Sequence, residues 1–223
     1  LGRIEILRHA ALAPDATKEP GGTSHMVVVD AWGNAVSMTT TVESIFGNGR
    51  MVDGFFLNNQ LTDFSFTPQE DGHPAANAVA AGKRPRSSMA PTLVMQPGTN
   101  GSPDTLTAAL GSPGGSVIIQ FVVKTLVGML DWKLNPQQAV SMIDFGTANT
   151  PTSNVGGEHP LVNTAHDGAD DPLARGLRER GEQVSVDDQS SGLSALQRSD
   201  DGWLGGADPR REGAVMGDDA SLK

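Results

Sequence analysis

The sequence predicts an α+β fold in which the sheet is largely antiparallel. Strand-like segments dominate the first half, an apolar helical segment lies in the middle, and strand-like segments return near the end. That order differs from the regular alternation of strands and helices that is typical of parallel sheets. The 223 residues are enough to bury one sizeable hydrophobic core.

The clearest predicted element is a β-hairpin in the first fifth of the chain. Met26–Val29 is an uninterrupted apolar run that favours a buried strand, and Ala35–Val42 is β-branched and alternating. Asp30, Gly33 and Asn34 lie between the two segments and are typical turn residues. Further strands are expected at Phe55–Asn59, Thr92–Gln96, Thr105–Leu110, Val184–Val186 and Gly202–Gly206.

The longest apolar stretch, Val117–Leu130, predicts a buried helix. It is interrupted by Gln120 and Lys124 and is too short to span a bilayer, so no membrane span is expected in this chain. Asn135 followed by Pro136 is typical of a helix N-cap and first helical position. The other expected segments are an amphipathic helix within 1–14, a surface helix at Pro172–Arg180, and loops at 67–82 and 145–168.

The composition disfavours several classes of function. The formal net charge is −10, and an acidic surface repels phosphate backbones, so nucleic acid is not an expected partner. The sequence has no cysteine, which excludes disulfides, thiolate metal sites and a cysteine nucleophile. The five histidines are scattered and form no His-Glu-x-x-His pattern, so a metal site is not expected.

A hydroxyl residue begins the first strand directly after a flexible linker. The linker, residues 13–22, contains two prolines and two glycines and ends at Gly22, next to Thr23. If the Gly22–Thr23 bond is cut, Thr23 gains a free α-amine with an unperturbed pKa of about 7.7–8.0. One residue then supplies both nucleophile and base. Taken alone, the local pattern is better explained by a threonine that simply begins a strand.

Three other segments carry groups that are suited to substrate binding. Gly111–Ser116 places adjacent glycines between a strand and a helix, where backbone N–H groups suit an oxyanion or a phosphate. Lys83–Met89 contains two serines whose hydroxyls are suited to donate to a carboxylate, and Gln60 and Asp63 are suited to accept from an ammonium group. Each segment alone is also explained by an ordinary turn or a solvated loop, and His25 by a hydrogen-bonded core histidine.

The order and combination of these segments resemble the small subunit of γ-glutamyltransferases over roughly residues 21–217. The motifs are Thr23-Ser-His25, Val28-Val-Asp30, Gly33–Thr41, Leu57–Gln60 with Asp63-Phe-Ser65, Lys83–Met89, Gly111–Ser116 and Gly206–Arg211. Members of this family are made as one precursor that cleaves itself into two subunits, and the new N-terminal threonine is the nucleophile. The resemblance therefore implies cleavage between Gly22 and Thr23.

The resemblance implies a role for each position that matches a family motif. Thr23 is the nucleophile, Thr41 forms a hydrogen bond with it, and Gly114 and Gly115 form the oxyanion hole. The implied substrate-binding residues are Gln60 and Asp63 for the α-amine and Ser87 and Ser88 for the α-carboxylate. Glu43 stands where many members have an asparagine near the substrate amine. Its negative charge is expected either to strengthen ammonium binding or to reshape the pocket.

The implied fold is the four-layer αββα sandwich of N-terminal nucleophile hydrolases, of which this chain supplies half. Residues 1–22 are expected to be the tail of the large subunit and the processing linker, and residues 23–223 the catalytic small subunit. The large subunit completes the fold as a heterodimer partner and supplies an arginine for the substrate carboxylate. The family also implies a periplasmic or extracellular location and no cofactor.

Three functions remain open at the level of sequence. The first is a γ-glutamyl hydrolase or transpeptidase that acts on glutathione-like amides through an acyl-enzyme. The second is a β-lactam side-chain acylase of the same family, for which the short 67–82 loop and the absence of tyrosine leave room. A glutaryl group has no α-amine, yet Gln60 and Asp63 are retained, so the first function is preferred. The third is a catalytically silent scaffold with this fold.

Overall fold

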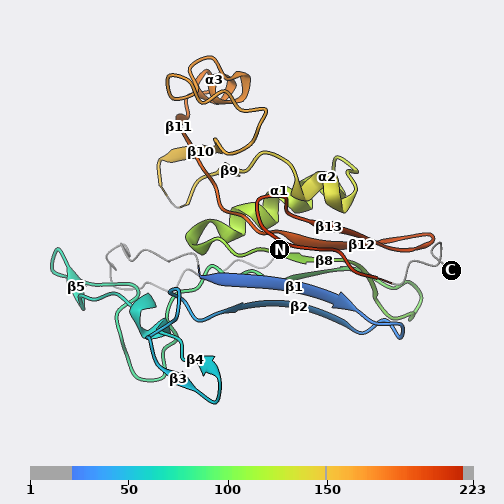
Figure 1. Ribbon diagram of the computed structural model, residues 1–223, viewed down its shortest axis with the longest axis horizontal. Coiled ribbons are helices and arrows are strands. Elements are labelled where there is room, and N and C mark those ends of the chain that lie inside the picture. Colours follow the sequence, from blue (N-terminus) through green and yellow to red (C-terminus); the bar gives the residue numbers. More distant parts are fainter. Residues whose placement is uncertain (1–21, 149, 218–223) are drawn as a thin grey trace. The chain divides into compact units, whose positions relative to one another are not determined.

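The computed structural model describes residues 22–148 and 150–217 (Figure 1). The described residues divide into two compact units, one formed by residues 22–41, 88–148 and 150–217 and the other by residues 42–87. The first and larger unit carries the helices and the longer strands. The second and smaller unit, in its described part, consists of short strands and turns.

The larger unit is built around a four-stranded antiparallel sheet in the order β13-β12-β8-β7. These strands are β7 (Thr92–Gln96), β8 (Thr105–Gly111), β12 (Ser194–Ser199) and β13 (Gly202–Ala207). The central strand β8 is buried from Ala108 to Gly111. Because successive side chains of a strand point to opposite faces, Ala108 and Leu110 face one side and Ala109 and Gly111 face the other. Both faces of β8 are therefore covered.

Two helices cover the face of the sheet that carries Ala108 and Leu110. Helix α1 (Ile118–Leu130) follows a short 3₁₀ turn, η2 (Gly115–Val117), and α2 (Pro136–Val140) begins with a capping box made by Asn135 and Gln138. The core between the helices and the sheet includes Leu110, Ile118, Phe121, Met129, Val140 and Leu193. Burial of each such large side chain contributes about 1.5–3 kcal/mol.

A hairpin of β1 (Thr23–Val29) and β2 (Ala35–Thr41) packs on the opposite face of this sheet, away from α1 and α2 (Figure 1). The close approach requires a glycine in β8, because a Cβ added at Gly111 would lie 2.2 Å from Cε1 of His25. The hairpin turn is held by Asp30, whose carboxylate accepts from the backbone amides of Trp32 and Asn34. Helices, sheet and hairpin thus give successive α, β and β layers within the larger unit.

The segment between α2 and β12 has more regular structure than the sequence predicts. The range 145–168, expected to be a loop, contains β9 (Phe145–Gly146) and β10 (Thr152–Gly156). Strand β10 pairs antiparallel with β9 and parallel with β11 (Gln183–Asp187), and α3 (Pro172–Arg178) lies between β10 and β11 along the chain. The loop prediction was wrong because β10 has only one large apolar residue, and its pairing depends on strands distant in sequence.

The smaller unit has only short elements between Val42 and Ser87. They are β3 (Met51–Val52), β4 (Phe55–Phe56), a 3₁₀ turn η1 (Gln60–Asp63), β5 (Gln69–Glu70) and β6 (His73–Pro74). The strand expected at Phe55–Asn59 ends at Phe56, because the polar residues that follow lead into η1. The range 67–82, expected to be a loop, contains the β5–β6 hairpin. Its turn residues Asp71 and Gly72 have positive φ angles of 50° and 77°, as an Asp-Gly hairpin turn requires.

The remaining sequence predictions compare with the structure as follows. Strand β7 has the expected bounds, and β8, β11, β13 and α1 are present with bounds that differ by one residue at one or both ends. Helix α3 ends at Arg178, two residues earlier than expected. Strand β12 was not expected, because its sequence Ser-Ala-Leu-Gln-Arg-Ser has little apolar character. The helix expected within 1–14 lies outside the described residues. The α+β class with a mostly antiparallel sheet is confirmed.

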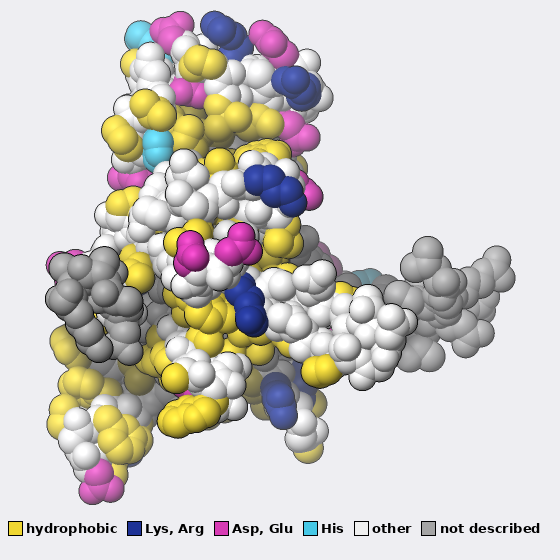
Figure 2. All heavy atoms as spheres, turned by 90° about the vertical axis from the view of Figure 1, so that its right-hand side faces the viewer, with side chains coloured by type: hydrophobic (Ala, Val, Ile, Leu, Met, Phe, Trp, Pro, Cys, Tyr) yellow, Lys and Arg dark blue, Asp and Glu magenta, His cyan; other side chains and the backbone are white. Residues whose placement is uncertain are grey.

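Apolar side chains remain exposed on several described elements. On the outer face of the β1–β2 hairpin, Met26, Val28, Val36 and Met38 are between 41% and 54% exposed. Figure 2 shows apolar side chains at the surface, with acidic and basic side chains scattered among them. Contiguous apolar surface of this kind marks an interaction face. In the part of the chain that the structure describes, no helix is long and apolar enough to cross a membrane.

Candidate active site

Thr23 begins β1, and its side chain is almost fully buried, with 7% exposed. The register of the hairpin places it directly opposite Thr41, the last residue of β2. The Thr41 hydroxyl donates a hydrogen bond to the carbonyl oxygen of Gly22 at 3.1 Å. This carbonyl belongs to the peptide bond between Gly22 and Thr23. The two threonines therefore flank the bond at which the sequence predicts cleavage.

The donor on the Gly22 carbonyl has a chemical consequence. It withdraws electron density from the carbonyl carbon and stabilises the negative charge that develops on the oxygen during nucleophilic attack. The structure shows the Thr41 hydroxyl donating to the carbonyl of Gly22, the residue before the expected nucleophile. Thr41 is therefore placed to assist attack on that peptide bond. The hydrogen bond between Thr41 and the nucleophile that the family resemblance implies stays a prediction.

Gly114 and Gly115 form the turn between β8 and α1, with positive φ angles of 141° and 60°. Gly114 also lacks room for a side chain, because an added Cβ would lie 2.6 Å from Cε2 of Phe121. Successive glycines at the start of a helix leave backbone N–H groups without intrahelical partners, which suits them to bind an anion. Pro113, directly before this turn, lines the same hollow as Thr23.

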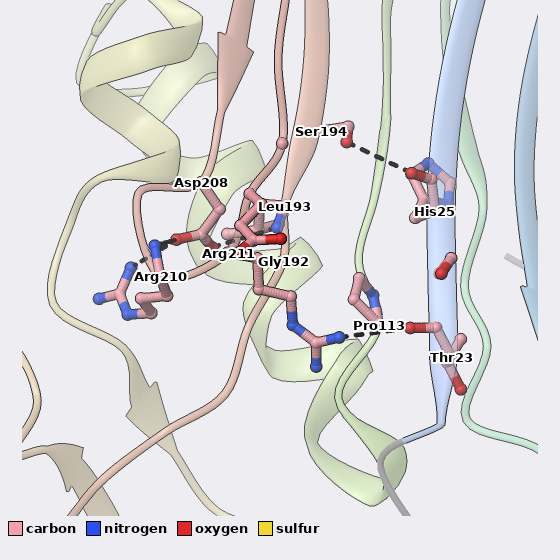
Figure 3. A pocket seen from close by; sticks show the side chains of 12 residues that line it. Thr23, His25, Pro113, Gly192, Leu193, Ser194, Asp208, Arg210 and Arg211 are labelled. Carbon is pink, nitrogen blue, oxygen red and sulfur yellow. Dashed lines mark hydrogen bonds and ion pairs between the residues drawn. The ribbon is translucent and has the colours of Figure 1, made fainter. Parts of the chain in front are cut away.

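A hollow of about 590 Å³ lies along β1 (Figure 3), with walls that include Thr23, His25, Pro113, Leu193, Asp208 and Arg211. Arg211 donates to the carbonyl oxygen of Thr23 at 3.4 Å and to that of Ser190 at 2.8 Å. The Ser194 hydroxyl donates to the carbonyl oxygen of His25 at 3.5 Å. Side chains from the C-terminal part of the chain therefore hold the edge of β1 that carries Thr23.

A buried cluster of charges supports the segment that follows β13. Arg210 forms ion pairs with Glu158 at 2.5 Å, with Asp208 at 3.2 Å and with Asp144 at 3.3 Å. Asp144 also pairs with Lys124 of α1 at 2.6 Å. Burial lowers the pKa of Lys124 and raises the pKa of Asp144, and the opposite charge of the partner counteracts each shift. The cluster thus connects α1 to the C-terminal segment.

In the smaller unit, Asp63 ends η1 and is 5% exposed. Its Oδ1 atom is buried and has no hydrogen-bond partner among the described residues. A buried carboxylate oxygen without a donor is costly, so this arrangement favours a donor supplied by a bound cation. Glu43 is also buried, with 5% exposed, and has a positive φ angle of 75°, which is uncommon for a residue with a side chain.

Asn77 holds the Asp63 turn in place. Its side-chain amide donates to the carbonyl oxygen of Asp63 at 2.5 Å, and its Oδ1 accepts from the backbone amide of Arg86 at 3.1 Å. Its own carbonyl accepts from the amide of Ser65 at 2.9 Å. Asn77 therefore connects the Asp63 turn to the segment that leads to Ser87.

The predicted site residues divide between the two units. Thr23, Thr41, Ser88, Gly114 and Gly115 belong to the larger unit, and Glu43, Gln60, Asp63 and Ser87 belong to the smaller unit. Gln60 is half-buried at the start of η1, Ser87 is exposed and Ser88 is buried. Within residues 22–148 and 150–217, no group of three His, Asp or Glu side chains is arranged to hold a metal ion.

Sequence reasoning did not single out Asn77 or Arg211. Asn77 lies in a range expected to be a loop, and nothing local distinguishes it from other loop asparagines. Arg211 lies in the family-like ending Gly206–Arg211, which is the only sequence signal that points to it. Both act through hydrogen bonds to distant backbone groups, so their partners are visible only in the fold.

The family model of γ-glutamyltranspeptidase matches residues 4–218 of this chain. The chain belongs to this family. The glutathione hydrolase proenzyme of Escherichia coli (strain K12) is 34% identical over 215 residues, which cover 92% of this chain and 33% of that protein. The chain therefore spans about a third or less of the length of the curated relatives that it matches.

Two solved structures of related proteins share the fold. An acivicin-inhibited γ-glutamyltranspeptidase, whose structure reveals critical roles for its C-terminus in autoprocessing and catalysis, gives a TM-score of 0.65 at 32% identity and covers 84% of this chain and 98% of that chain. The cephalosporin acylase of Bacillus halodurans gives a TM-score of 0.68 at 25% identity and covers 91% of this chain and 35% of that chain. The N-terminal nucleophile hydrolase fold expected from the γ-glutamyltranspeptidase resemblance is thus confirmed.

Proposed function

We propose that this chain carries the catalytic small-subunit part of a γ-glutamyl hydrolase or transpeptidase, in which Thr23 becomes the nucleophile. The observation that carries the proposal is the hydrogen bond from Thr41 to the Gly22 carbonyl, beside the buried Thr23. Membership of the γ-glutamyltranspeptidase family supports the reaction class. Residues 1–22 are then the tail of the large subunit with the processing linker, and residues 23–223 are the small subunit.

Cleavage begins when the hydroxyl oxygen of Thr23 attacks the carbonyl carbon of Gly22. Thr41 stabilises the charge that develops on the carbonyl oxygen. The hydroxyl loses its proton, the departing amide nitrogen gains one, and the peptide bond becomes an ester between Gly22 and the Thr23 side chain. Water then attacks the ester, which releases Gly22 as a carboxylate and restores the hydroxyl beside a free α-amine.

The free amine of Thr23 supplies the base for turnover, because an α-amine has an unperturbed pKa of about 7.7–8.0. It accepts the hydroxyl proton as the oxygen attacks the γ-glutamyl carbonyl, and it returns a proton to the leaving amine. The N–H groups at Gly114 and Gly115 stabilise the oxyanion, and loss of one such donor typically lowers the rate about 10²–10³-fold. Water or the amine of an amino acid or peptide then takes the γ-glutamyl group.

The glutamyl group of the substrate is assigned to polar residues by the family motifs and by burial. The buried Oδ1 of Asp63, which lacks a donor among the described residues, suits the substrate ammonium. Gln60 adds a neutral acceptor, and the buried Glu43 adds a second negative charge. Ser87 and Ser88 supply hydroxyl donors for the α-carboxylate.

The proposed partner is the large subunit of the same precursor. The chain spans about a third or less of the length of its curated relatives, and the outer face of the β1–β2 hairpin is apolar and exposed. Strands and helices of the large subunit would cover this face and complete the αββα sandwich, of which the larger unit shows three layers. The family further supports a periplasmic or extracellular enzyme, and the chemistry requires no cofactor.

A glutaryl or cephalosporin side-chain acylase is the second candidate. The similarity to the cephalosporin acylase of Bacillus halodurans favours it. A glutaryl group lacks the α-amine, however, and without a bound cation the burial of the Asp63 Oδ1 atom, which has no hydrogen-bond partner among the described residues, is costly. The γ-glutamyl substrate is therefore preferred.

Side-by-side turnover of a γ-glutamyl anilide and a glutaryl cephalosporin by the full-length protein tests this choice. The γ-glutamyl compound is expected to react faster, and faster turnover of the glutaryl compound would reverse the assignment.

Thr23→Ala is expected to abolish both cleavage and turnover. Thr99→Ala, the same change at an exposed position in the loop between β7 and β8, is the matched control and should retain both. Substantial turnover by Thr23→Ala would place the nucleophile elsewhere.

A further inference from the structure

His25 is a polar group near the nucleophile that the proposed reaction leaves without a role. It lies two residues after Thr23, so both side chains point to the same face of β1. This face is turned towards β8, where the imidazole occupies the space above Gly111. A Cβ added at Gly111 would lie 2.2 Å from Cε1, 2.5 Å from Nε2 and 2.6 Å from Nδ1 of His25. The ring thus packs directly on the backbone of the strand that leads to Gly114.

The hydrogen bonds around His25 select one tautomer. The Ser37 hydroxyl donates its single proton to the carbonyl oxygen of Leu110 at 3.0 Å, and its oxygen lies 3.3 Å from Nε2 of His25. Ser37 therefore meets the ring as an acceptor, so the proton is on Nε2. Nδ1 then accepts from the Thr39 hydroxyl at 2.9 Å. Burial favours this neutral form, because it lowers the pKa of His25 from 6.5 to about 4.

These hydrogen bonds connect three strands at one point. Ser37 and Thr39 come from β2, His25 from β1, and the accepting carbonyl of Leu110 from β8. The backbone carbonyl of His25 also accepts from Ser194 at the start of β12, as Figure 3 shows. The strand that begins with Thr23 and the strand that ends before Gly114 therefore share a single polar junction.

We propose that His25 is a positioning residue that fixes the Thr23 end of β1 relative to the Gly114–Gly115 turn. The inference rests on the proposed function, which assigns Thr23 as nucleophile and the two glycines as oxyanion donors. His25 acts through its packing on Gly111 and its bonds to Ser37 and Thr39. Because a misplacement of about 1 Å at a reacting group costs about 10²-fold in rate, loss of this junction is expected to lower kcat.

His25→Leu and His25→Gln form a matched pair of similar size. Leucine fills the space without hydrogen bonds, so kcat for a γ-glutamyl anilide is expected to fall about 10²-fold. KM should stay unchanged, because the groups assigned to the substrate's amine and carboxylate are untouched. Glutamine places an N–H donor near the position of Nε2 and is expected to recover most of the lost kcat. A leucine variant with wild-type kcat, or a glutamine variant no better than leucine, would overturn the inference.

Gly111→Ala provides a second test that keeps the imidazole. In the wild-type protein the added methyl group displaces the ring, so kcat is expected to fall. In a His25→Ala background the space is free, so the same methyl group should have little further effect. This non-additivity is the signature of direct contact, and additive losses in the double variant would contradict it. The cycle stays informative if His25→Leu folds poorly.

The His25 inference and the proposed function fail in different ways. The His25 inference alone is overturned if the wild-type protein cleaves its Gly22–Thr23 bond and turns over the γ-glutamyl anilide, and the His25→Leu variant has the same kcat. A Thr23→Ala variant that retains turnover overturns the proposed function. Thermal denaturation of each purified variant, compared with the wild type, shows whether a lost kcat reflects unfolding instead of misplacement.

Discussion

Replacement of Thr41 by valine removes one hydroxyl and keeps the size and the β-branched shape of the side chain. In the structure that hydroxyl donates to the Gly22 carbonyl oxygen at 3.1 Å. The pairing of β1 with β2 uses backbone atoms, and valine favours strands, so the hairpin is expected to persist. The effect of the substitution should therefore fall on the chemistry at the Gly22–Thr23 bond.

The magnitude follows from the charge on the accepting oxygen. Towards the neutral carbonyl, a hydrogen bond of this kind contributes about 0.5–1.5 kcal/mol net. Towards the oxyanion of the transition state, one donor contributes about 2.7–4 kcal/mol. Cleavage of the Gly22–Thr23 bond in Thr41→Val is therefore expected to slow about 10²–10³-fold.

The assay follows the conversion of the intact precursor into two chains by mass spectrometry over time. Thr99→Val is the matched control, because Thr99 is an exposed threonine in the loop between β7 and β8. It should cleave at the wild-type rate. Equal cleavage rates for Thr41→Val and Thr99→Val would refute the role derived for the Thr41 hydroxyl.

Three ionisable groups, two buried and one half-buried, give further expectations. Asp63→Asn removes the charge proposed to hold the α-amine of the substrate. The value of kcat/KM should therefore fall about 10–100-fold more for a γ-glutamyl anilide than for a glutaryl analogue. Equal losses for the two substrates would show that Asp63 does not recognise the amine. Lys124→Met removes one of the two cations that form ion pairs with the buried Asp144, and Arg210 is the other. Urea titrations should therefore show that the free energy of unfolding falls by about 3 kcal/mol. An unchanged free energy of unfolding would contradict this expectation. Because the pKa of His25 is lowered from 6.5 to about 4, the unfolded chain binds more protons than the folded protein between these values. Stability contributed by neutral His25 is thus present above pH 6.5 and lost as the pH falls towards about 4, and His25→Gln should remove that part of the pH dependence; superimposable stability curves would contradict it.

The hairpin that carries Thr23 was predictable because its signals are local. An apolar run, three turn residues and a β-branched segment follow one another, and the structure forms β1 and β2 there. Strands β10 and β12 were missed because their sequences are short and polar. Each becomes a strand through pairing with segments far along the chain, β11 for β10 and β8 for β12.

The candidate site was predictable in its residues more than in its contacts. The motifs identified Thr23, Thr41 and the two glycines, and the structure adds that Thr41 bonds to the Gly22 carbonyl. That contact depends on the register of the hairpin, which the sequence does not specify atom by atom. Arg211 contacts the carbonyl of a residue 188 positions away, and no local pattern predicts such a pair.

The N-terminal residue of the purified, active protein tests the central claim most directly. Intact-mass measurement and N-terminal sequencing should find one chain that begins at Thr23 and a separate chain that ends at Gly22. The Thr23→Ala variant should remain one uncleaved chain without turnover. A fully active protein in which Gly22 and Thr23 are still joined would contradict the account, because Thr23 would then lack the free amine that the proposed chemistry requires.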